Sequence, residues 1–532
     1  MQSIYHQADC VLVWLGLEDV SNSKIMHLLK RIDKSHHPAR VRDGREWLPD
    51  GKCLDRYRSD LVAFLRNAYF RRVWVIQEIA LGSEVFVVCG SQGVRWSALD
   101  ALVGCIWKET PIRGRAIDHL AQLCQSRSRR LEAQPVSLLQ VLSESREAEA
   151  TEPRDKLYGI LSLAFDSSLY VIQLDYSRTD SCVCLEVTRA VIWAKRSLDI
   201  IFVSSRREKS SLRLPSWCPD YLHWPGDPAC NQLVPYVSGL DSRASGAPGP
   251  AKWRASGGSL VNRDVVRIQH RLLLTRGIKI GTINGLGCLP RERCKPCHTG
   301  DSFRPCSRSD RALFSAITRT LGLHGWSSPQ ANANTDNGDG ISRLFYYLYT
   351  FDTSRKAGSK NSRYFKERYS TIIDWREANR NFRVFGKTLG ERSNNMDASL
   401  YTGAFRDSVH ALIRAAMRSG DNAWINPWNY GHTGHRLPAE LGVALDGLQS
   451  LIRAELRLMT TSKDDVGWAH PDARLDDGIW LLHGCSLPAV LRPSGSHEDE
   501  HILVGYAYVE GVMNGEEWMR RETRDLRQVV LC

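Results

Sequence analysis

The sequence predicts an α/β protein with an α/β unit at the N-terminus, a helical middle and a small β-rich module at the C-terminus. Val11, Val13 and Leu15 alternate with other residues as in a strand, and "EVFVVCG" (84–90) alternates in the same way. Segments with helical spacing lie between and after these strands, as in a layered α/β fold. The last hundred residues hold short apolar stretches punctuated by Gly and Pro, which are typical of β structure.

Each element follows from its own pattern. Ile4, Tyr5 and Ala8 have helical spacing, so a short helix precedes the first strand. The same reasoning predicts helices over 17–36, 54–69, 71–81, 95–107, 115–145, 155–165 and 181–196. "RLLLTRGIKIGTI" (271–283) predicts a strand, a turn and a second strand.

A chain of 532 residues is too long for one hydrophobic core. We expect an α/β domain over 1–110, a helical region over 111–235, a variable region over 236–430 and the β-rich module over 431–532. The variable region carries polar stretches rich in Gly, Ser, Pro and Asn, which are typical of linkers and disordered inserts.

The composition is that of an ordinary globular protein, with 42% hydrophobic and 24% charged residues. No apolar run reaches the ~18 residues that a membrane helix needs. Asp9 interrupts the first apolar run, so the N-terminus does not resemble a signal peptide. The fifteen cysteines are odd in number, and Cys10, Cys89 and Cys105 lie in apolar patterns. Free thiols and a cytoplasmic location are therefore expected.

The net charge of +12 permits binding to polyanions. Residues 355–387 concentrate ten Lys and Arg against three Asp and Glu, with six aromatic residues between them. A surface that binds single-stranded nucleic acid combines these features. A solvated helical face above core aromatics has the same composition, and we favour that interpretation.

The segment "YFRRVWVIQEIALG" concentrates more polar, charged and aromatic side chains of possible catalytic use than any other. On a helix, Trp74, Gln77 and Glu78 share one face, and Arg71 and Arg72 stand one turn earlier. A carboxyl group buried beside Trp resists ionisation and can serve as a general acid or base, which makes Glu78 the candidate catalytic residue. The alternative is a buried Glu that ties its helix to a neighbouring segment. We also expect Trp74 to be buried.

"TEPRDKLYGILSLA" is the second notable stretch. Pro153 can open a helix, and the guanidinium of Arg154 suits a carboxylate or a phosphate. Because adjacent helical residues diverge, we expect Arg154 and Asp155 to contact different partners, with Tyr158 beside the core. Pairing with other segments of the chain is the favoured role.

"CLPRERCKPCHTGDSFRPC" holds Cys288, Cys294, Cys297 and Cys306. One C-x-x-C pair with further ligands nearby is compatible with zinc. Because the segment is polar and has only one such pair, we predict that Cys294 and Cys297 hold no structural metal, and we assign no metal ligands.

"LPSWCPDY" places Trp217 between two prolines, where an aromatic side chain usually anchors a connection onto the core. The sequence contains no phosphate loop, dinucleotide fingerprint, G-x-S-x-G or H-E-x-x-H motif. No cofactor is therefore expected.

Taken in order, these blocks resemble the fungal heterokaryon-incompatibility (HET) domain family. The first family block, M-x-x-I-Y-x-x-A-x-x-V-x-V-W-L-G, is matched by Met1, Ile4, Tyr5, Ala8, Val11, Val13, Trp14, Leu15 and Gly16. The R-x-W-x-x-Q-E block is matched by Arg72, Trp74, Gln77 and Glu78, and the P-R-D-x-x-Y block by Pro153, Arg154, Asp155 and Tyr158. The D-Y-S block is matched by Asp175, Tyr176 and Ser177, and the P-S-W-x-x-D block by Pro215, Ser216, Trp217 and Asp220. The last hundred residues resemble the small module that closes many members.

The resemblance implies a Rossmann-like N-terminal unit that is distantly similar to Toll-like TIR domains. In the family, a core strand and a W-I-D-x-x-C-I-N-Q block precede the helix at Met1, and no such block occurs in this sequence. We therefore expect an incomplete, N-terminally shortened HET unit. We also expect the strand at 11–16 to be apolar on both faces and buried between layers.

The resemblance implies a protein of non-self recognition and programmed cell death that acts by recognition and signalling with protein partners, and self-association is compatible with that role. Two alternatives remain. One is a TIR-like enzyme that hydrolyses NAD as its substrate, with Glu78 as the carboxylate. The other is a nucleic-acid-binding protein that uses 355–387.

Overall fold

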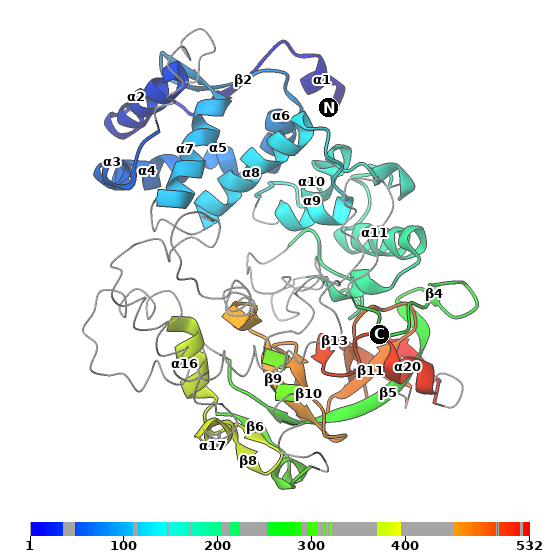
Figure 1. Cartoon of the computed structure of the whole chain (residues 1–532). Helices are drawn as coiled ribbons and strands as arrows, with labels where there is room; N and C mark the ends of the chain where they lie inside the picture. The colour runs from blue at the N-terminus through cyan, green and yellow to red at the C-terminus, as the bar shows by residue number, and fades with distance from the viewer. Residues whose placement is uncertain are drawn as a thin grey trace.

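The computed structural model describes residues 2–35, 48–109, 115–145, 148–203, 212–223, 253–289, 295–321, 370–394 and 448–532, with short gaps inside some of these ranges. Within them, helices dominate the first two hundred residues and strands dominate the C-terminal part (Figure 1). The predicted α/β class is confirmed. No described helix is both long and apolar enough to cross a bilayer.

The N-terminal sheet has three strands in the order β1–β2–β3. Helix α1 (Gln2–Gln7) leads into β1 (Val11–Trp14), which lies parallel to β2 (Val85–Cys89). Strand β3 (Gln92–Arg95) returns antiparallel to β2. Gly90 makes that turn with a φ of 55°, a conformation that costs glycine little.

Helices cover one face of this sheet and fill the space below it (Figure 1). They are α2 (Val20–Ser35), α3 (Gly51–Arg56), α4 (Arg58–Leu65), α5 (Ala68–Arg71), α6 (Val73–Leu81), α7 (Trp96–Glu109) and α8 (Arg115–Leu131). The predicted helices at 17–36, 71–81 and 95–107 are confirmed. The single helix predicted over 54–69 is wrong, because the chain forms short helices there and Asn67 caps α5 by accepting the N–H of Tyr69.

The expectation that β1 is buried on both faces is also wrong. Val11 and Val13 lie in the core, whereas Leu12 is 60% and Trp14 50% exposed. The described helices α2 and α7 both contact the sheet, and they leave this second face of β1 open to solvent.

The middle of the chain is helical: the helix predicted over 181–196 is confirmed, whereas the segments predicted as helices over 115–145 and 155–165 form shorter pieces. It comprises α9 (Leu138–Glu144), α10 (Asp155–Tyr158), the 3-10 turns η2 (Leu161–Leu163) and η3 (Ser167–Leu169), α11 (Asp180–Lys195) and η4 (Asp199–Phe202). Thr179 caps α11 by accepting the N–H of Cys182. Lys195, in the last turn of α11, pairs with the buried carboxylate of Asp166 at 2.8 Å.

The C-terminal part is a closed barrel. Its strands are β5 (Leu272–Leu286), β9 (Arg457–Thr461), β10 (Val466–Ala469), β11 (Gly478–Leu482), β12 (Ala489–Pro493) and β13 (Glu500–Val509). The order β10–β9–β5–β11–β12–β13 closes through the β10–β13 pairing. Strands β4 (Arg267–Gln269), β6 (Cys297–His298) and β14 (Arg527–Leu531) pair along β5, and α20 (Glu516–Arg521) packs near it.

Strand β5 is continuous through Gly277, so the turn predicted inside 271–283 is wrong. The first half of β5 pairs with β14 and β11, and its last residues pair with β9. Because two sets of neighbours bind its two halves, the long strand has no need to fold back. The barrel also extends beyond the module expected at 431–532, since β5 belongs to its wall.

Apart from β4, β5 and β6, the described part of the variable region packs beside the barrel. It contains η7 (Gly300–Phe303), α16 (Ser370–Ala378), β7 (Arg383–Val384), β8 (Lys387–Thr388) and α17 (Leu389–Asn394). Trp375 on α16 is buried against Trp468 of the barrel, with ring centroids 5.6 Å apart. The insert expected at 327–340 lies outside the described residues, and so do the linkers expected at 204–213 and 238–259 apart from residues 212–213 and 253–259.

The P-S-W segment joins the helical middle to the barrel. Trp217 is fully buried, and its indole N–H donates to the carbonyl of Arg271 at 3.0 Å. Ser216 accepts the backbone N–H of Leu503 on β13 and donates its own N–H to the carbonyl of Cys532. The segment thus lies against the barrel wall, with the aromatic side chain in the core.

Candidate functional site

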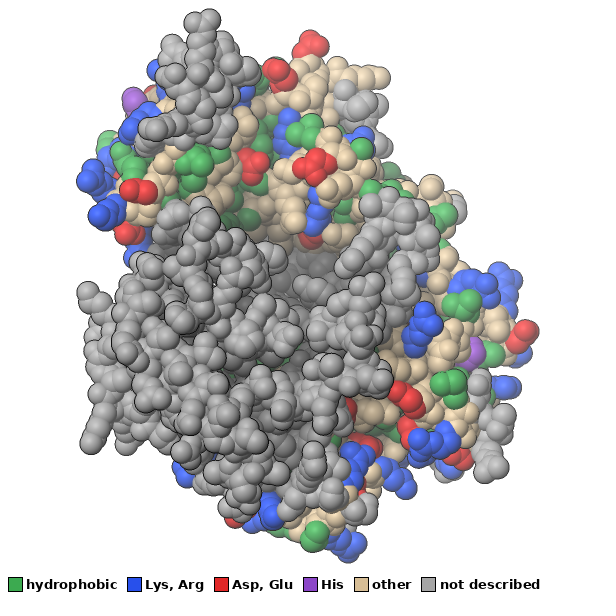
Figure 2. Space-filling view, viewed as in Figure 1, with side chains coloured by type: hydrophobic (Ala, Val, Ile, Leu, Met, Phe, Trp, Pro, Cys, Tyr) green, Lys and Arg blue, Asp and Glu red, His purple; other side chains and the backbone are tan. Residues whose placement is uncertain are grey.

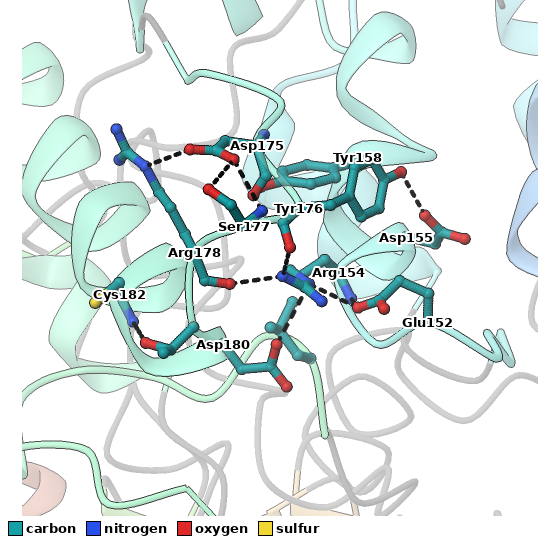
Figure 3. A network of polar contacts seen from close by, with 12 residues as sticks. Glu152, Arg154, Asp155, Tyr158, Asp175, Tyr176, Ser177, Arg178, Asp180 and Cys182 are labelled. Atoms are coloured by element: carbon teal, nitrogen blue, oxygen red, sulfur yellow. Dashed lines mark hydrogen bonds and ion pairs between the residues drawn. The ribbon is translucent and has the colours of Figure 1, made fainter.

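Two of the sequence blocks, P-R-D-x-x-Y and D-Y-S, meet in one polar network beside α10 (Figure 3), and Trp74 of a third block donates to it. At its centre, the Nε of Arg154 donates to Glu152 at 2.6 Å. One terminal nitrogen of Arg154 donates to the carbonyls of Tyr176 and Arg178, both at 2.6 Å. Its Nε also lies 3.5 Å from the carboxylate of Asp180 at the start of α11. Arg154 thereby fixes the loop that carries the D-Y-S block.

Asp155 faces a different set of partners, as expected from its position next to Arg154. Its Oδ2 accepts the indole N–H of Trp74 at 3.0 Å, and its Oδ1 accepts the hydroxyl of Tyr176 at 2.8 Å. Trp74 is only partly buried, so the expectation of a buried indole is corrected. Its polar edge reaches Asp155 across the junction between α6 and α10.

The D-Y-S block closes the network from the other side. The Tyr158 hydroxyl donates to the carbonyl of Asp175 at 3.2 Å, and the Tyr158 and Tyr176 rings meet edge to face at 5.2 Å. Asp175 accepts both the N–H and the hydroxyl of Ser177. Arg178 pairs with Asp175 at 3.2 Å and with Glu186 on α11.

The electrostatics of the network agree with these bonds. Burial, followed by the hydrogen bond to Asp155, raises the pKa of Tyr176 to about 12. The donors of Ser177 lower the pKa of Asp175, and the bond from Arg154 lowers the pKa of Glu152. The carboxylates are therefore held ionised and the phenol neutral at physiological pH.

Glu78 lies in a second, separate cluster. Its Oε1 accepts the hydroxyl of Tyr5 on α1 at 3.2 Å, and its Oε2 accepts the hydroxyl of Tyr69 on α5 at 2.6 Å. Burial and the Glu78 charge raise the pKa of Tyr5 to about 12, and burial and the bond to Glu78 raise the pKa of Tyr69 as well. The two phenols orient a half-buried carboxylate and tie α6 to α1 and α5.

The other residues of the R-x-W-x-x-Q-E block point to separate partners. The side-chain N–H of Gln77 is buried and donates to the carbonyl of Gly159 at 2.6 Å. Arg72 is exposed and precedes α6 in extended conformation. Arg71 pairs with Glu149 at 2.9 Å on the surface. Trp74, Gln77 and Glu78 thus fix α6 in three directions and do not meet in one pocket.

Gly16 and Trp14 of the first block lie in or beside the N-terminal sheet. Gly16 follows β1 with a φ of 105° and accepts the N–H of Gly90. Only glycine adopts that conformation at little cost. Trp14 lies on the solvent-exposed face of β1.

The cysteine stretch is described only in part. Cys294 lies outside the described residues, while Cys288 is buried, Cys306 is half-buried and Cys297 is exposed. Among the residues that the structure describes, no group of three or more His, Cys, Asp or Glu side chains is placed to hold a metal ion.

The basic stretch 355–387 is described from residue 370 onward; Tyr364, Phe365 and Tyr369 lie outside the described residues. In the described part, Trp375, Phe382 and Phe385 are at most 3% exposed, which removes them from any base-stacking surface. On the face shown in Figure 2, the described Lys and Arg side chains lie in small groups interspersed with Asp and Glu.

The network around Arg154 and Asp155 orients segments of the chain, because its hydrogen bonds tie the P-R-D-x-x-Y turn to α6 and to the D-Y-S loop. Sequence reasoning missed Tyr69 as a partner of Glu78, and it missed Glu152 and Asp180 as partners of Arg154. Glu152 stands two residues before Arg154, and this short separation could have indicated that the two side chains pair. Nothing local could indicate Tyr69 or Asp180.

Comparisons with known proteins match both ends of the chain. Residues 1–78 match the family model described as heterokaryon incompatibility protein (HET), and residues 433–529 match the Het-6 beta-barrel domain. A curated protein of Neurospora crassa, heterokaryon incompatibility protein 6, OR allele, is 27% identical over 281 residues. The match covers 42% of this chain and 41% of that relative, so this chain spans less than half of it. No solved structure matches the chain.

Proposed function

We propose that this chain, which matches a HET segment and a Het-6 barrel in one polypeptide, belongs to the fungal heterokaryon-incompatibility family and acts in non-self recognition between fungal cells. Its proposed action is recognition and signalling that ends in growth arrest or cell death, with protein partners in the cytoplasm. The curated relative carries incompatibility in its name, which supports the same role here.

The observation that carries this proposal is the junction around Arg154 and Asp155. Trp74 of the HET unit, the P-R-D-x-x-Y turn and the D-Y-S loop meet there through directed hydrogen bonds. The P-S-W segment then binds the helical middle to the barrel. A signalling protein needs such fixed joints, because a change at one module must reach the other.

We also propose that the N-terminal unit is related to Rossmann and TIR folds. A parallel β1–β2 pair with a helical crossover between its strands, as in those folds, supports the relationship. The helices between β1 and β2 supply that crossover.

The test is inducible expression of this chain in a filamentous fungus, with growth and membrane integrity scored after induction. We expect growth arrest, and we expect Asp155→Ala to abolish it because both Trp74 and Tyr176 lose their acceptor. Asp9→Ala, at an exposed position outside the network, is the matched control. Normal growth with abundant folded protein would contradict the proposal.

Hydrolysis of NAD is a second candidate function, and the geometry around Glu78 supports it. Two phenol hydroxyls hold its half-buried carboxylate in one orientation, as a site that binds a sugar hydroxyl or a cationic intermediate requires. Incubation of purified protein with NAD, compared with Glu78→Gln and with the surface control Glu149→Gln, tests this activity. Equal loss of NAD with all three proteins would exclude Glu78 as the catalytic carboxylate.

A further inference from the structure

The hairpin of β4 and β5 carries cations on its outer face. Arg267 on β4 lies opposite Leu274 on β5 in the pairing register, and Arg276 stands two positions after Leu274. Opposed residues of two strands project to one face, and so do alternate residues of one strand, which makes Arg267 and Arg276 diagonal neighbours. Both side chains are exposed, and neither forms an ion pair with a carboxylate in the described part of the chain.

Further arginines surround this hairpin. Arg189 on α11 donates to the carbonyl of His270 in the hairpin turn, and Arg271 donates to the carbonyl of Arg213. A carbonyl leaves the charge of a guanidinium uncompensated, and residues 253–276 contain five arginines against one acidic residue, Asp264. The exposed arginines of this region are Arg196, Arg213, Arg263, Arg267, Arg271 and Arg276.

Two exposed aliphatic side chains lie among these cations. Leu260 is 53% exposed, and Met519 on α20 is 71% exposed. His483 connects their surroundings: its Nε2 lies 3.1 Å from the carbonyl oxygen of Leu260, and its ring centroid lies 5.9 Å from that of Trp518, the residue before Met519. The backbone N–H of His483 donates to the carbonyl of Arg276 at 2.9 Å. Figure 1 shows α11, β4 and α20 along the same side of the molecule.

We propose that these six exposed arginines, together with Leu260 and Met519, form an arginine surface that docks onto a membrane containing anionic phospholipids. The planar guanidinium group binds phosphate oxygens through two parallel hydrogen bonds. Each basic side chain near an anionic lipid surface adds to the attraction. Leu260 and Met519 supply the apolar part, because aliphatic side chains enter the boundary between headgroups and acyl chains.

The side chains that accompany the arginines favour lipid over a nucleic-acid strand. Single-stranded nucleic acid offers the same phosphate groups, but its bases stack on exposed aromatic rings. Trp193 on α11 is half-buried and already carries the guanidinium of Arg263 over its ring, 5.8 Å from the centroid. Trp518 is only 2% exposed. The exposed apolar groups are thus aliphatic, as insertion into lipid requires.

The docking depends on this surface alone and does not rest on the proposed function. The purified full chain is sedimented with vesicles of phosphatidylcholine and with vesicles of phosphatidylcholine mixed with phosphatidylserine. We expect binding to the mixed vesicles, little binding to phosphatidylcholine, and release at high salt, because salt screens the attraction. Absence of binding to the mixed vesicles at low salt would overturn the proposal.

The contribution of the arginines is tested by charge reversal. Arg267→Glu/Arg276→Glu should lower the partition coefficient onto mixed vesicles by at least ~10-fold. Arg56→Glu/Arg66→Glu is the matched control, since both residues are exposed on N-terminal helices and the change of net charge is the same. It should alter binding by less than about 2-fold, because the attraction falls off within a Debye length. Circular dichroism establishes that both variants remain folded. Equal binding of the two variants would refute the assignment to this surface.

The aliphatic side chains separate lipid from nucleic acid. Leu260→Gln/Met519→Gln keeps the net charge and should weaken binding to mixed vesicles by about 5-fold, whereas Leu169→Gln, at a position 59% exposed outside the surface, should not. Fluorescence anisotropy with a single-stranded RNA in the same buffer is the second measurement. RNA bound more tightly than the mixed vesicles, with the aliphatic variant unaffected, would assign the arginine surface to nucleic acid and overturn the proposal.

Discussion

Asp155 binds two donors that come from widely separated parts of the sequence. Each donor occupies its own carboxylate oxygen, Trp74 on Oδ2 and Tyr176 on Oδ1. An acceptor shared in this way couples the two donors, because removal of one lets the carboxylate rotate toward the other. The coupling is measurable as a departure from additivity.

We expect Trp74→Phe and Tyr176→Phe each to lower the free energy of unfolding by roughly 1 kcal/mol, since each removes one hydrogen bond and keeps an aromatic ring. The double variant should lose an amount that differs from the sum by ~0.5 kcal/mol or more. Urea denaturation of the four proteins measures this difference. Tyr170→Phe, whose hydroxyl donates to Asp166 in another network, is the control and should be additive with Trp74→Phe.

The phenol of Tyr5 should titrate late. Its pKa is raised to about 12 by burial first and by Glu78 second, against about 10 in the unfolded chain. A raised pKa favours the neutral phenol in the folded state, so this contribution to stability is complete below pH 10 and is lost as the pH rises through about 12. Phenolate absorbance against pH measures the shift.

Glu78→Gln removes the negative charge and keeps an acceptor for the Tyr5 hydroxyl. The titration of Tyr5 should move back toward about pH 10 without reaching it, because burial remains the larger cause. Tyr5→Phe assigns the absorbance change to this residue. An unchanged titration in Glu78→Gln would show that the two side chains do not interact in solution.

In the barrel, a side chain cannot be added where the backbones of two strands approach closely. Gly467 on β10 is the clearest case, because a Cβ atom there would lie 2.0 Å from the carbonyl oxygen of Tyr508 on β13. This pairing is the one that closes the barrel. The close approach requires glycine at this position, whatever the intrinsic preference of glycine for strands.

Gly467→Ala should therefore destabilise the protein severely, with loss of the barrel signal in thermal unfolding. Gly104→Ala is the opposite case: Gly104 lies inside α7, and nothing lies within 4 Å of its added Cβ. Alanine is favoured over glycine in a helix interior, so Gly104→Ala should stabilise by up to ~1 kcal/mol. Equal effects of the two substitutions would contradict the closure of the barrel through β10 and β13.

Across the whole molecule, the helical middle and the barrel share one continuous core. Asp199 on η4 marks their boundary, where its buried carboxylate accepts the N–H and the hydroxyl of Ser486 at 2.7 and 2.8 Å. Leu198 donates its N–H to the carbonyl of Gly484 beside it. These bonds join the two parts across almost three hundred positions of sequence.

Burial raises the pKa of Asp199, and the donors of Ser486 and Ser197 oppose that shift. A carboxyl group whose pKa is raised by folding binds its proton more tightly in the folded chain. Its contribution to stability is complete below its pKa in the unfolded chain, about 3.9, and is lost as the pH rises through its pKa in the folded chain. Asp199→Asn has no such titration. The stability of the wild-type protein relative to Asp199→Asn should therefore fall over this pH window, as denaturation at a series of pH values would measure. A constant difference would contradict the raised pKa.

The sequence predicted the helices at 17–36, 71–81 and 95–107, the strands at 11–15 and 84–90, and the β structure of the last hundred residues. Each of these has a complete local pattern, with apolar residues at helical or alternating spacing. It predicted that Arg154 and Asp155 have different partners, because adjacent helical residues diverge. The motif blocks also predicted the family that the comparisons support.

Only the tertiary structure decided which segments meet. Three features depend on neighbours far away in the sequence. Tyr69 and Tyr5 bind Glu78, the partly buried Trp74 places its N–H on Asp155, and β5 runs unbroken. The exposed face of β1 has the same cause: an apolar alternation indicates a strand but does not state whether a layer covers each side. Periodicity reports the conformation of a segment, whereas burial and bonding are decided by the segments packed against it.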